Sequence, residues 1–370
     1  MKKLLHLQLL PLLSGVQNFS LHLLAGLNPE EYEIHVASQP GGPLVQEVQR
    51  RGYTYHPLSQ LRHPISWRDI PAFWQILRLC KREGFDIVHT NSSKPGLLGR
   101  IAARLAGVPL IIHSSHGTPF QQGQFRALYL FYMGMEWVGG LFGDYIAFVN
   151  HSDRLNYIRW RLIPKRKAVT VYNALPDVEI EKLTAPPRSI DKDAEILIGS
   201  TLRFSTQKNI VEVILAACEA CAQQPRLRFV FVGEGEHYAL CRSIVSAKKM
   251  NERILLPGWD SNVSQWLAKM DVFLLYSRWE ALPFSIIEAN YSGLPVVGSA
   301  IESIMELVND EVGWVVPLDD RQALVKTLVS LPQDPAQIRE KAEKAARRIR
   351  ELRNYKEMVE GYLELYRSVK

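Results

Sequence analysis

The chain has 370 residues, 47% of them hydrophobic and 22% charged, which is typical of a globular protein and excludes a disordered or fibrous one. Its length suggests two domains. The net charge of +6 is uneven, because residues 1–185 carry 20 Lys and Arg against 13 Asp and Glu.

The N-terminal stretch MKKLLHLQLLPLLSG has the lysines and leucines of a signal peptide. His6, Gln8 and Pro11 interrupt its apolar run and no A-x-A cleavage site follows, so we expect a buried first strand. Apolar strands then alternate with helical segments, which predicts a parallel sheet covered by helices. The predicted strands of this half are 4–10, 33–38, 86–91, 109–115, 144–149 and 167–173.

The longest apolar stretch, 127–149, contains Glu136, Asp144 and four glycines, so we expect an amphipathic helix followed by a strand and not a membrane-spanning helix. The stretch 154–167 follows, with six positive charges, no acid, and interleaved Tyr157 and Trp160. This pattern suits anionic lipid headgroups or nucleic acid. A solvated helix face and loop is the alternative.

Residues 184–195 are rich in proline and charge, which predicts a linker. The alternation then restarts, and residues 337–370 form a charged amphipathic helical region. The chain is therefore expected to hold two doubly wound α/β domains in tandem with a cleft between them. Cys218 and Cys221 fall in an apolar helical run without partner ligands, which favours buried cysteines over a zinc site. The predicted strands of this half are 195–201, 228–235, 253–258, 271–277 and 295–300.

Ligands of such sheets bind beyond the carboxyl ends of the strands. Arg203 and Lys208 share one loop after a predicted strand, and two cations at such a place suit a diphosphate. Gly233 follows the next strand in VGEG; a lone G-x-G is a weak nucleotide signal, and a tight strand-exit turn explains it better. Trp259, in LPGW, follows another strand at a turn suited to a flat base.

Glu280 and Glu288 lie in RWEALPFSIIEA. On one continuous helix the two carboxylates would point roughly 80° apart, so the spacing suits a helix opened by Pro283 instead. The helix start favours a phosphate, and the glutamates suit sugar hydroxyls. Since no GxxxxGK[ST] motif or aspartate pair is present, we expect a nucleotide sugar rather than ATP as the ligand and no metal or other cofactor.

The whole chain resembles the GT-B glycosyltransferases of family 4, which are retaining and use nucleotide sugars. The resemblance rests on the motifs above, on EANYSGLPVVGS, and on DIVHTNSSKPGLLGRIAARLAGVP, IIHSSHGTPF and VYNALPD in the first half. It implies a GT-B fold of two Rossmann-like domains. We expect an acceptor-binding domain at 1–185, a donor-binding domain at 186–350, and a C-terminal helix, 351–370, that packs back on the first domain.

The resemblance also implies roles for individual residues. The diphosphate would be bound by Arg203 and Lys208, the ribose by Glu288, and the donor sugar by Glu280 and the backbone around Leu282, Pro283, Phe284 and Ser285. Gly15, Gly233 and Trp259 complete the expected donor site, and Asn91 and His116 the acceptor side. The expected catalytic residues are His116, Glu280, Arg203 and Lys208.

Two motifs depart from the family pattern. The early GG is Ser14-Gly15 here, so Gly15 alone remains to allow close backbone approach to a phosphate, and the N-G-(I/V)-D step is Asn173-Ala174-Leu175. Neither departure touches the cationic pair or the glutamates.

The resulting hypothesis is a glycosyltransferase that moves a sugar from a UDP-sugar to a saccharide acceptor. The expected acceptor is a polyprenyl-diphosphate-linked intermediate of lipopolysaccharide O-antigen, capsule or exopolysaccharide. The enzyme would be cytoplasmic and peripheral on the inner face of an anionic membrane. A GT-B-like UDP-sugar epimerase or hydrolase and a non-catalytic membrane-associated scaffold are the alternatives. Nucleic acid is not an expected partner, because no nucleic-acid-binding motif accompanies the basic stretch.

Overall fold

The computed structural model describes the chain except residues 63–64, 121–123, 184–190, 192–193 and 370. The described residues divide into two compact units, Met1–Asn173 with Tyr355–Lys370, and Ala174–Asn354. The division falls at the Asn173-Ala174 step, earlier than the expected boundary at 185, and most of the expected linker at 184–195 lies outside the described residues.

The first unit is a parallel sheet in the order β3-β2-β1-β4-β5-β6-β7. Its strands are β1 (Lys2–Leu7), β2 (Tyr32–Ser38), β3 (Thr54–Pro57), β4 (Ile87–Asn91), β5 (Leu110–Ser115), β6 (Tyr145–Phe148) and β7 (Ala168–Thr170). Its helices are α1 (Gly15–Ala25), α2 (Pro43–Arg50), α3 (Asp69–Glu83), α4 (Ser93–Ala106), α5 (Arg126–Phe142), α6 (His151–Arg159), the 3₁₀ turn η1 (Lys165–Lys167) and α15 (Tyr355–Arg367).

The second unit is a parallel sheet in the order β10-β9-β8-β11-β12-β13. Its strands are β8 (Ile196–Thr201), β9 (Leu227–Val232), β10 (Ile254–Gly258), β11 (Val272–Leu275), β12 (Val296–Ser299) and β13 (Gly313–Val316). Its helices are α7 (Asp177–Leu183), α8 (Ile210–Gln223), α9 (Tyr238–Ala247), α10 (Val263–Leu267), α11 (Phe284–Tyr291), α12 (Glu302–Met305), α13 (Arg321–Ser330), η2 (Leu331–Gln333) and α14 (Pro335–Leu352).

Each sheet reverses its strand order once, between β1 and β4 in the first unit and between β8 and β11 in the second. Such a switch point opens a crevice outside the carboxyl ends of the two strands, where doubly wound sheets bind ligands. The loops that follow these four strands are therefore the places to look for function.

Most strands are buried on both faces, as expected for parallel sheets between helices, whereas the edge strands β3 and β10 are partly exposed. The core of the second unit includes Ile198, Phe229 and Val272 from the sheet and Val213 and Cys218 from α8. Both cysteines of the C-x2-C pair are buried there, and the described residues contain no group of three or more His, Cys, Asp or Glu side chains placed to hold a metal.

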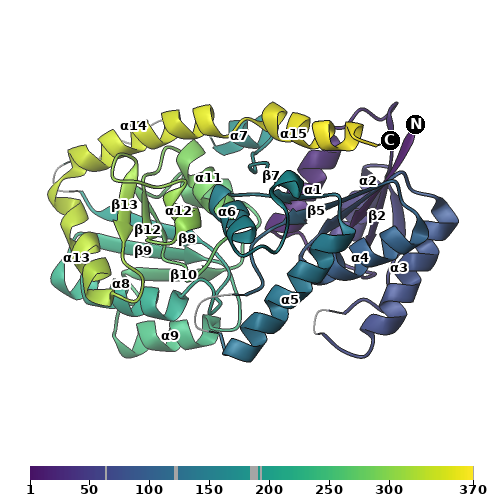
Figure 1. The fold of residues 1–370 in the computed structure, drawn as a ribbon. Coiled ribbons are helices and arrows are strands. Elements are labelled where there is room, and N and C mark those ends of the chain that lie inside the picture. The colour runs from purple at the N-terminus through teal and green to yellow at the C-terminus, as the bar shows by residue number, and fades with distance from the viewer. Residues whose placement is uncertain (63–64, 121–123, 184–190, 192–193, 370) are drawn as a thin grey trace. The chain divides into compact units, whose positions relative to one another are not determined.

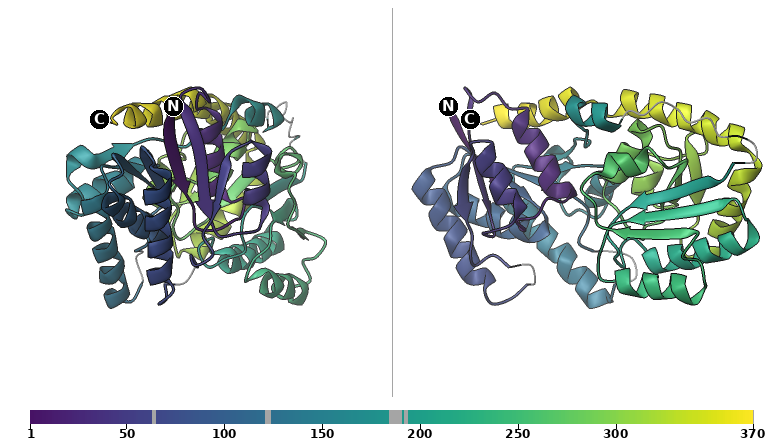
Figure 2. Two further views of the ribbon diagram at one scale, coloured as in Figure 1. Left: turned by 90° about the vertical axis from the view of Figure 1, so that its right-hand side faces the viewer. Right: turned by 180° about the vertical axis from the view of Figure 1, so that it is seen from behind.

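The C-terminal region is two helices, α14 and α15, rather than one continuous segment. The second of them, α15, packs in the first unit, where the Tyr355 hydroxyl donates to the carbonyl of His22 over 2.8 Å. The two ends of the chain consequently lie close together, as Figures 1 and 2 show, and Lys2 Nζ donates to the carbonyl of Tyr366.

Residues 126–148 form a helix followed by a strand, as expected. Among the helices that the structure describes, none combines the length and the apolar character needed to cross a bilayer.

Candidate active site

In the second unit, the loops after β8 and β11 are tied together at the switch point. The amide of Arg278 donates to the carbonyl of Gln207 over 2.9 Å, and the Gln207 side-chain amide donates to the carbonyl of Trp279 over 3.1 Å. The loop that carries the two predicted cations therefore lies against the loop that carries Glu280.

Lys208 and Glu280 form an ion pair in which Nζ lies 2.5 Å from Oε1. The Lys208 side chain is 17% exposed and that of Glu280 only 7%, so water screens the pair weakly. Arg203 lies in the same loop as Lys208 and is exposed. The structure thus brings together two residues to which the family resemblance assigns separate parts of the donor.

The glycines of VGEG, at the end of β9, lie against the backbone of the loop that follows β8. Gly233 has φ +138° and Gly235 φ +155°, and a Cβ at either position would overlap the carbonyl oxygen of Leu202 or Phe204, respectively. The amide of Phe204 in turn donates to the carbonyl of Glu234 over 2.9 Å. These glycines allow the β9 exit to press against the segment that carries Arg203, which is the tight turn expected from the sequence.

Trp259 follows β10, whose last residue, Gly258, accepts a hydrogen bond from the amide of Gly233 over 2.7 Å. Trp259 is 71% exposed. The next residue, Asp260, holds the turn, since its Oδ2 accepts a 2.8 Å hydrogen bond from the indole of Trp266. A large exposed aromatic ring beside a fixed turn has the chemistry to stack on a flat base.

Helix α11 begins at Phe284, and Pro283 is its N-cap residue with φ −73°. The predicted helix start is therefore confirmed. Leu282 and Pro283 are buried, whereas Ser285 is half-buried in the first turn. A helix start directs its first N–H groups and the positive end of its dipole outward, which favours an anion.

The two glutamates lie in different electrostatic environments. Glu280 precedes α11 and pairs with Lys208, whereas Glu288 lies in the second turn of the helix. Burial, together with the nearby carboxylate of Glu179 on α7, raises the pKa of Glu288 to about 7. Glu280 is thus held beside a cation, and Glu288 is poised to change charge near neutral pH.

In the first unit, Asn91 is the last residue of β4 and His116 follows β5. The His116 Nε2–H donates to Oδ1 of Asn91 over 3.0 Å, and the ring of Phe19 on α1 packs edge-on against the imidazole with centroids 4.8 Å apart. Gly15 is the first residue of that helix. The three residues expected in this unit therefore lie at the carboxyl ends of neighbouring strands.

His116 begins a chain of buried hydrogen bonds that sequence reasoning missed. Its partner Asn91 lies 3.4 Å from Nδ1 of His6, and Nε2 of His6 lies 3.2 Å from the hydroxyl of Tyr366. That hydroxyl lies 2.6 Å from Nδ1 of His89. The chain continues from His89 through Ser114 (2.7 Å) to the hydroxyl of Tyr362 (2.8 Å).

Every link of this chain has one donor and one acceptor when all three histidines are neutral. Burial supports this state, since it lowers the pKa of His6 and of His116 to about 3 and the pKa of His89 well below its ordinary value. His116 is therefore a neutral imidazole at physiological pH, and the hydrogen-bonded chain fixes which of its nitrogens carries the proton.

Two family models match the chain, "Glycosyl transferase 4-like domain" over residues 14–174 and "Glycosyl transferases group 1" over residues 184–349. The chain is 31% identical over 344 residues to an Escherichia coli UDP-Gal:alpha-D-GlcNAc-diphosphoundecaprenol alpha-1,3-galactosyltransferase, with 90% of this chain and 88% of the relative covered. It is 30% identical over 256 residues to the Salmonella typhi Vi polysaccharide biosynthesis protein VipC/TviE, covering 66% of this chain and 43% of that protein.

Among solved structures, HepE of Anabaena in complex with UDP and glucose matches all of both chains with a TM-score of 0.83 at 15% identity. Sucrose-phosphate synthase of Thermosynechococcus elongatus covers 99% of this chain and 98% of its own, with a TM-score of 0.80 at 16% identity. These likenesses concern the fold. Together with the family models and the galactosyltransferase relative, they establish that the chain is a glycosyltransferase of the GT-B fold and belongs to family 4.

Proposed function

We propose that this glycosyltransferase moves a hexose, with retention of configuration, from a UDP-sugar to a hydroxyl of a polyprenyl-diphosphate-linked saccharide. The observation that carries the proposal is the Lys208–Glu280 pair directly before the start of α11. It sets a cation, a sugar-binding carboxylate and a helix N-terminus at the mouth of one switch point. We propose further that transfer needs no metal or other cofactor.

The donor fits the chemistry of these residues. Arg203 and Lys208 neutralise a diphosphate, and the first turn of α11 adds N–H donors. When the donor binds, its phosphate competes with Glu280 for Lys208, which frees the Glu280 carboxylate to accept hydrogen bonds from sugar hydroxyls. Glu288 accepts from the ribose, and Trp259 stacks on the base.

The acceptor is inferred from the relatives. The Escherichia coli galactosyltransferase acts, by its name, on a GlcNAc-diphosphoundecaprenol, and other relatives are polysaccharide and O-antigen biosynthesis proteins. A polyprenyl chain keeps such an acceptor in a bilayer. The enzyme is therefore proposed to work peripherally on the cytoplasmic face of the membrane, in the synthesis of O-antigen, capsule or exopolysaccharide.

In the proposed reaction, the bond between the anomeric carbon and the UDP oxygen breaks, and the acceptor oxygen bonds to the same face of that carbon. The acceptor proton passes to the leaving diphosphate, so the products are UDP and the glycoside. Lys208, Arg203 and the α11 N-terminus stabilise the charge that develops on the leaving group. The proton of neutral His116 is on Nε2 and is donated to Asn91, so Nδ1 is the nitrogen that can accept a hydrogen bond from a substrate hydroxyl near the anomeric carbon without adding charge.

The decisive test is transfer assayed with a panel of UDP-sugars and lipid-diphosphate-linked saccharides, comparing wild type with Lys208→Ala. The variant should lose a factor of about 10² or more in kcat, the usual loss when a positioned electrostatic group is removed. Wild-type turnover in Lys208→Ala would overturn the assignment of the donor site. Transfer in the presence of a chelator tests the absence of a metal requirement.

The alternatives are separated by incubating the enzyme with the donor alone. An epimerase or hydrolase consumes the UDP-sugar without acceptor, whereas the proposed transferase consumes it at a substantial rate only when acceptor is present. A scaffold consumes none under any condition. The anomeric configuration of the product, read from its NMR coupling constants, decides between retention and inversion.

A further inference from the structure

Helix α5 exposes an apolar face. Leu130, Phe131, Trp137 and Leu141, the α5 stripe, are between 49% and 58% exposed. At about 100° per residue, Leu130, Trp137 and Leu141 fall within about 40° of one another around the helix axis, and Phe131 extends this to an arc of about 120°. An exposed stripe of this kind on a helix normally marks a surface that binds a partner or a membrane.

The only charged residue within 127–143 points away from this face. Glu136 is buried, and its Oε2 accepts a 3.3 Å hydrogen bond from the equally buried guanidinium of Arg100 on α4. Tyr129, Tyr132 and Met133, on the flank of α5 that carries Glu136, also pack inward. The α5 stripe therefore does not belong to the core of the unit that carries it.

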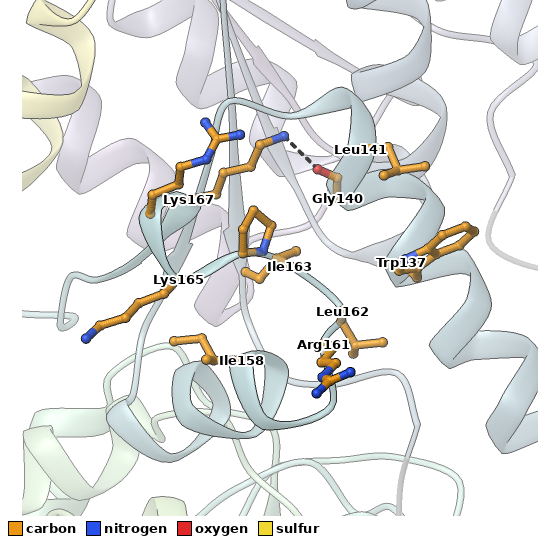
Figure 3. Close-up of a pocket in the computed structure, with 11 residues that line it drawn as sticks. Trp137, Gly140, Leu141, Ile158, Arg161, Leu162, Ile163, Lys165 and Lys167 are labelled. Carbon is orange, nitrogen blue, oxygen red and sulfur yellow. Dashed lines mark hydrogen bonds between the residues drawn. The ribbon is translucent and has the colours of Figure 1, made fainter.

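A basic pocket adjoins the end of the α5 stripe. It has a volume of about 490 Å³ and is lined by Trp137, Gly140 and Leu141 of α5 and by residues 158 and 161–167, as Figure 3 shows. Four of the eleven described lining residues are basic and none of those eleven is acidic. We call this the α5 pocket; its basic residues are Arg161, Lys165, Arg166 and Lys167.

The four basic residues differ in their surroundings. Lys167 Nζ donates to the carbonyls of Gly140 (3.0 Å) and Gly143 (2.6 Å), which fastens the loop to the C-terminal end of α5. Arg161, Lys165 and Arg166 are exposed. Their charges therefore face solvent beside the exposed side chains of Trp137 and Leu141.

We propose that the α5 stripe and the α5 pocket form a docking surface for an anionic phospholipid bilayer. The stripe enters the interface between headgroups and acyl chains, where an exposed tryptophan is favourable, and the pocket takes lipid phosphates. Charge complementarity selects this occupant, because a bilayer pairs an apolar layer with an adjacent layer of negative charge as the surface pairs the stripe with the bases. This inference deepens the proposed function and rests on its membrane-borne acceptor.

Two surface variants and one matched control test the proposal by flotation with vesicles of phosphatidylcholine, alone or mixed with phosphatidylglycerol. Lys165→Glu/Arg166→Glu reverses the charge of the pocket, and Trp137→Ser/Leu141→Ser removes the stripe. Arg242→Glu/Lys248→Glu, the α9 control, makes the same charge change at an exposed residue of α9 and at the exposed residue that follows this helix in the second unit. Circular dichroism melting confirms that all variants fold.

The wild type and the α9 control should bind the anionic vesicles alike and the neutral vesicles weakly. Both surface variants should lose at least about tenfold in affinity, since each basic residue near such a membrane contributes roughly 1 kcal/mol and apolar burial contributes comparably. Inorganic phosphate should not displace the wild-type protein from the vesicles, because free phosphate offers no acyl layer for the α5 stripe. Unchanged binding by either surface variant, or equal loss in the α9 control, would overturn the proposal.

A second assay separates this proposal from the proposed function. The surface variants should transfer sugar normally to a short-chain, water-soluble acceptor and poorly to a long-chain acceptor in vesicles. A wild type that transfers to neither acceptor but floats with anionic vesicles refutes the proposed function alone. If the stripe variant instead turns a dimer into a monomer while vesicle binding stays unchanged, the stripe is a contact between copies and the docking proposal fails.

Discussion

The hydroxyl of Tyr366 lies 2.6 Å from Nδ1 of His89 although 277 residues separate them in the chain. The same hydroxyl lies 3.2 Å from Nε2 of His6, so one atom of α15 serves two strands of the first sheet. Through His6 and Asn91 this hydroxyl also connects to the proposed active-site residue His116. The C-terminal helix thus contributes polar contacts at the carboxyl-end edge of the sheet as well as apolar packing.

Replacing Tyr366 by phenylalanine should destabilise the protein by about 1–3 kcal/mol, because it leaves Nε2 of His6 and Nδ1 of His89 buried without their hydrogen-bond partner. The measurement is the free energy of unfolding in urea at pH 7.5. Tyr32→Phe is the matched control, since the Tyr32 ring packs beside that of Tyr366 with centroids 5.9 Å apart and is outside the hydrogen-bonded chain. An equal loss of unfolding free energy in the two variants would show that the hydrogen bonds of Tyr366 contribute nothing to stability.

The buried histidines predict acid sensitivity. The pKa values of His6 and His116 are lowered to about 3 by burial, whereas in the unfolded chain they titrate near 6.5. The unfolded state therefore binds more protons between these values, so stability is complete above pH 6.5 and falls as the pH drops toward 3. Urea unfolding at pH 7.5, 6.5 and 5.5 should show this decline, and His6→Gln should reduce its slope. A free energy of unfolding that does not change over this pH range would contradict the conclusion that the buried histidines are neutral.

Gly233 offers a test of how closely β9 must approach the loop that carries Arg203. Gly233→Ala should cost about 3 kcal/mol or more, since a Cβ there overlaps the carbonyl oxygen of Leu202 in addition to the strain of a positive φ. Gly293→Ala is the control: it has φ +72° with nothing within 4 Å of the added carbon, so it should cost only about 1 kcal/mol. Similar losses of unfolding free energy at both positions would show that the positive φ alone, and not the contact with Leu202, destabilises the variant.

Some parts of the fold could be read from the sequence and others could not. The alternation of apolar strands with helices was enough to predict two parallel sheets, because buried parallel strands have continuous apolar runs. It missed β3 and β13, which are four-residue strands at the edges of their sheets. The half-exposed sequence TYHP of β3 ends in proline and has no apolar run, so its pairing with β2 depends on the tertiary structure.

The site shows the same division. The sequence placed Lys208 and Glu280 in loops after two strands, and the structure has them there, at the edge where the carboxyl ends of parallel strands meet. Their ion pair was not predicted, since 72 residues separate them and only the packing of two loops brings them together. The chain from His116 to Tyr366 was not predicted for the same reason: His89 belongs to one of the family motifs, but nothing in the sequence pairs it with Tyr366.

Glu288 should make donor binding depend on pH near neutrality. Burial and the carboxylate of Glu179 raise its pKa to about 7, so in the free enzyme it ionises as the pH rises through this value. A ribose hydroxyl donates more strongly to a carboxylate than to a carboxylic acid, so UDP affinity should rise between pH 6 and pH 8. Isothermal titration of the unliganded protein with UDP at several pH values measures this change in affinity.

Two substitutions separate the charge of Glu288 from its surroundings. Glu179→Gln removes the repulsive carboxylate and should shift the midpoint of the affinity profile to lower pH without reducing the affinity at pH 8. Glu288→Gln should abolish the rise near pH 7 and weaken UDP binding about tenfold to a hundredfold, the range for a lost hydrogen bond to a charged group. The contribution of Glu288 to the stability of the free protein has the opposite dependence, because a raised carboxyl pKa stabilises the fold at low pH and this contribution is lost as the pH rises from 4.5 through about 7. It is measured as the difference in the free energy of unfolding between wild type and Glu288→Gln, which separates it from the contribution of the histidines. This difference should fall as the pH rises toward 7 while UDP affinity rises, and a difference that does not change with pH would exclude the raised pKa of Glu288.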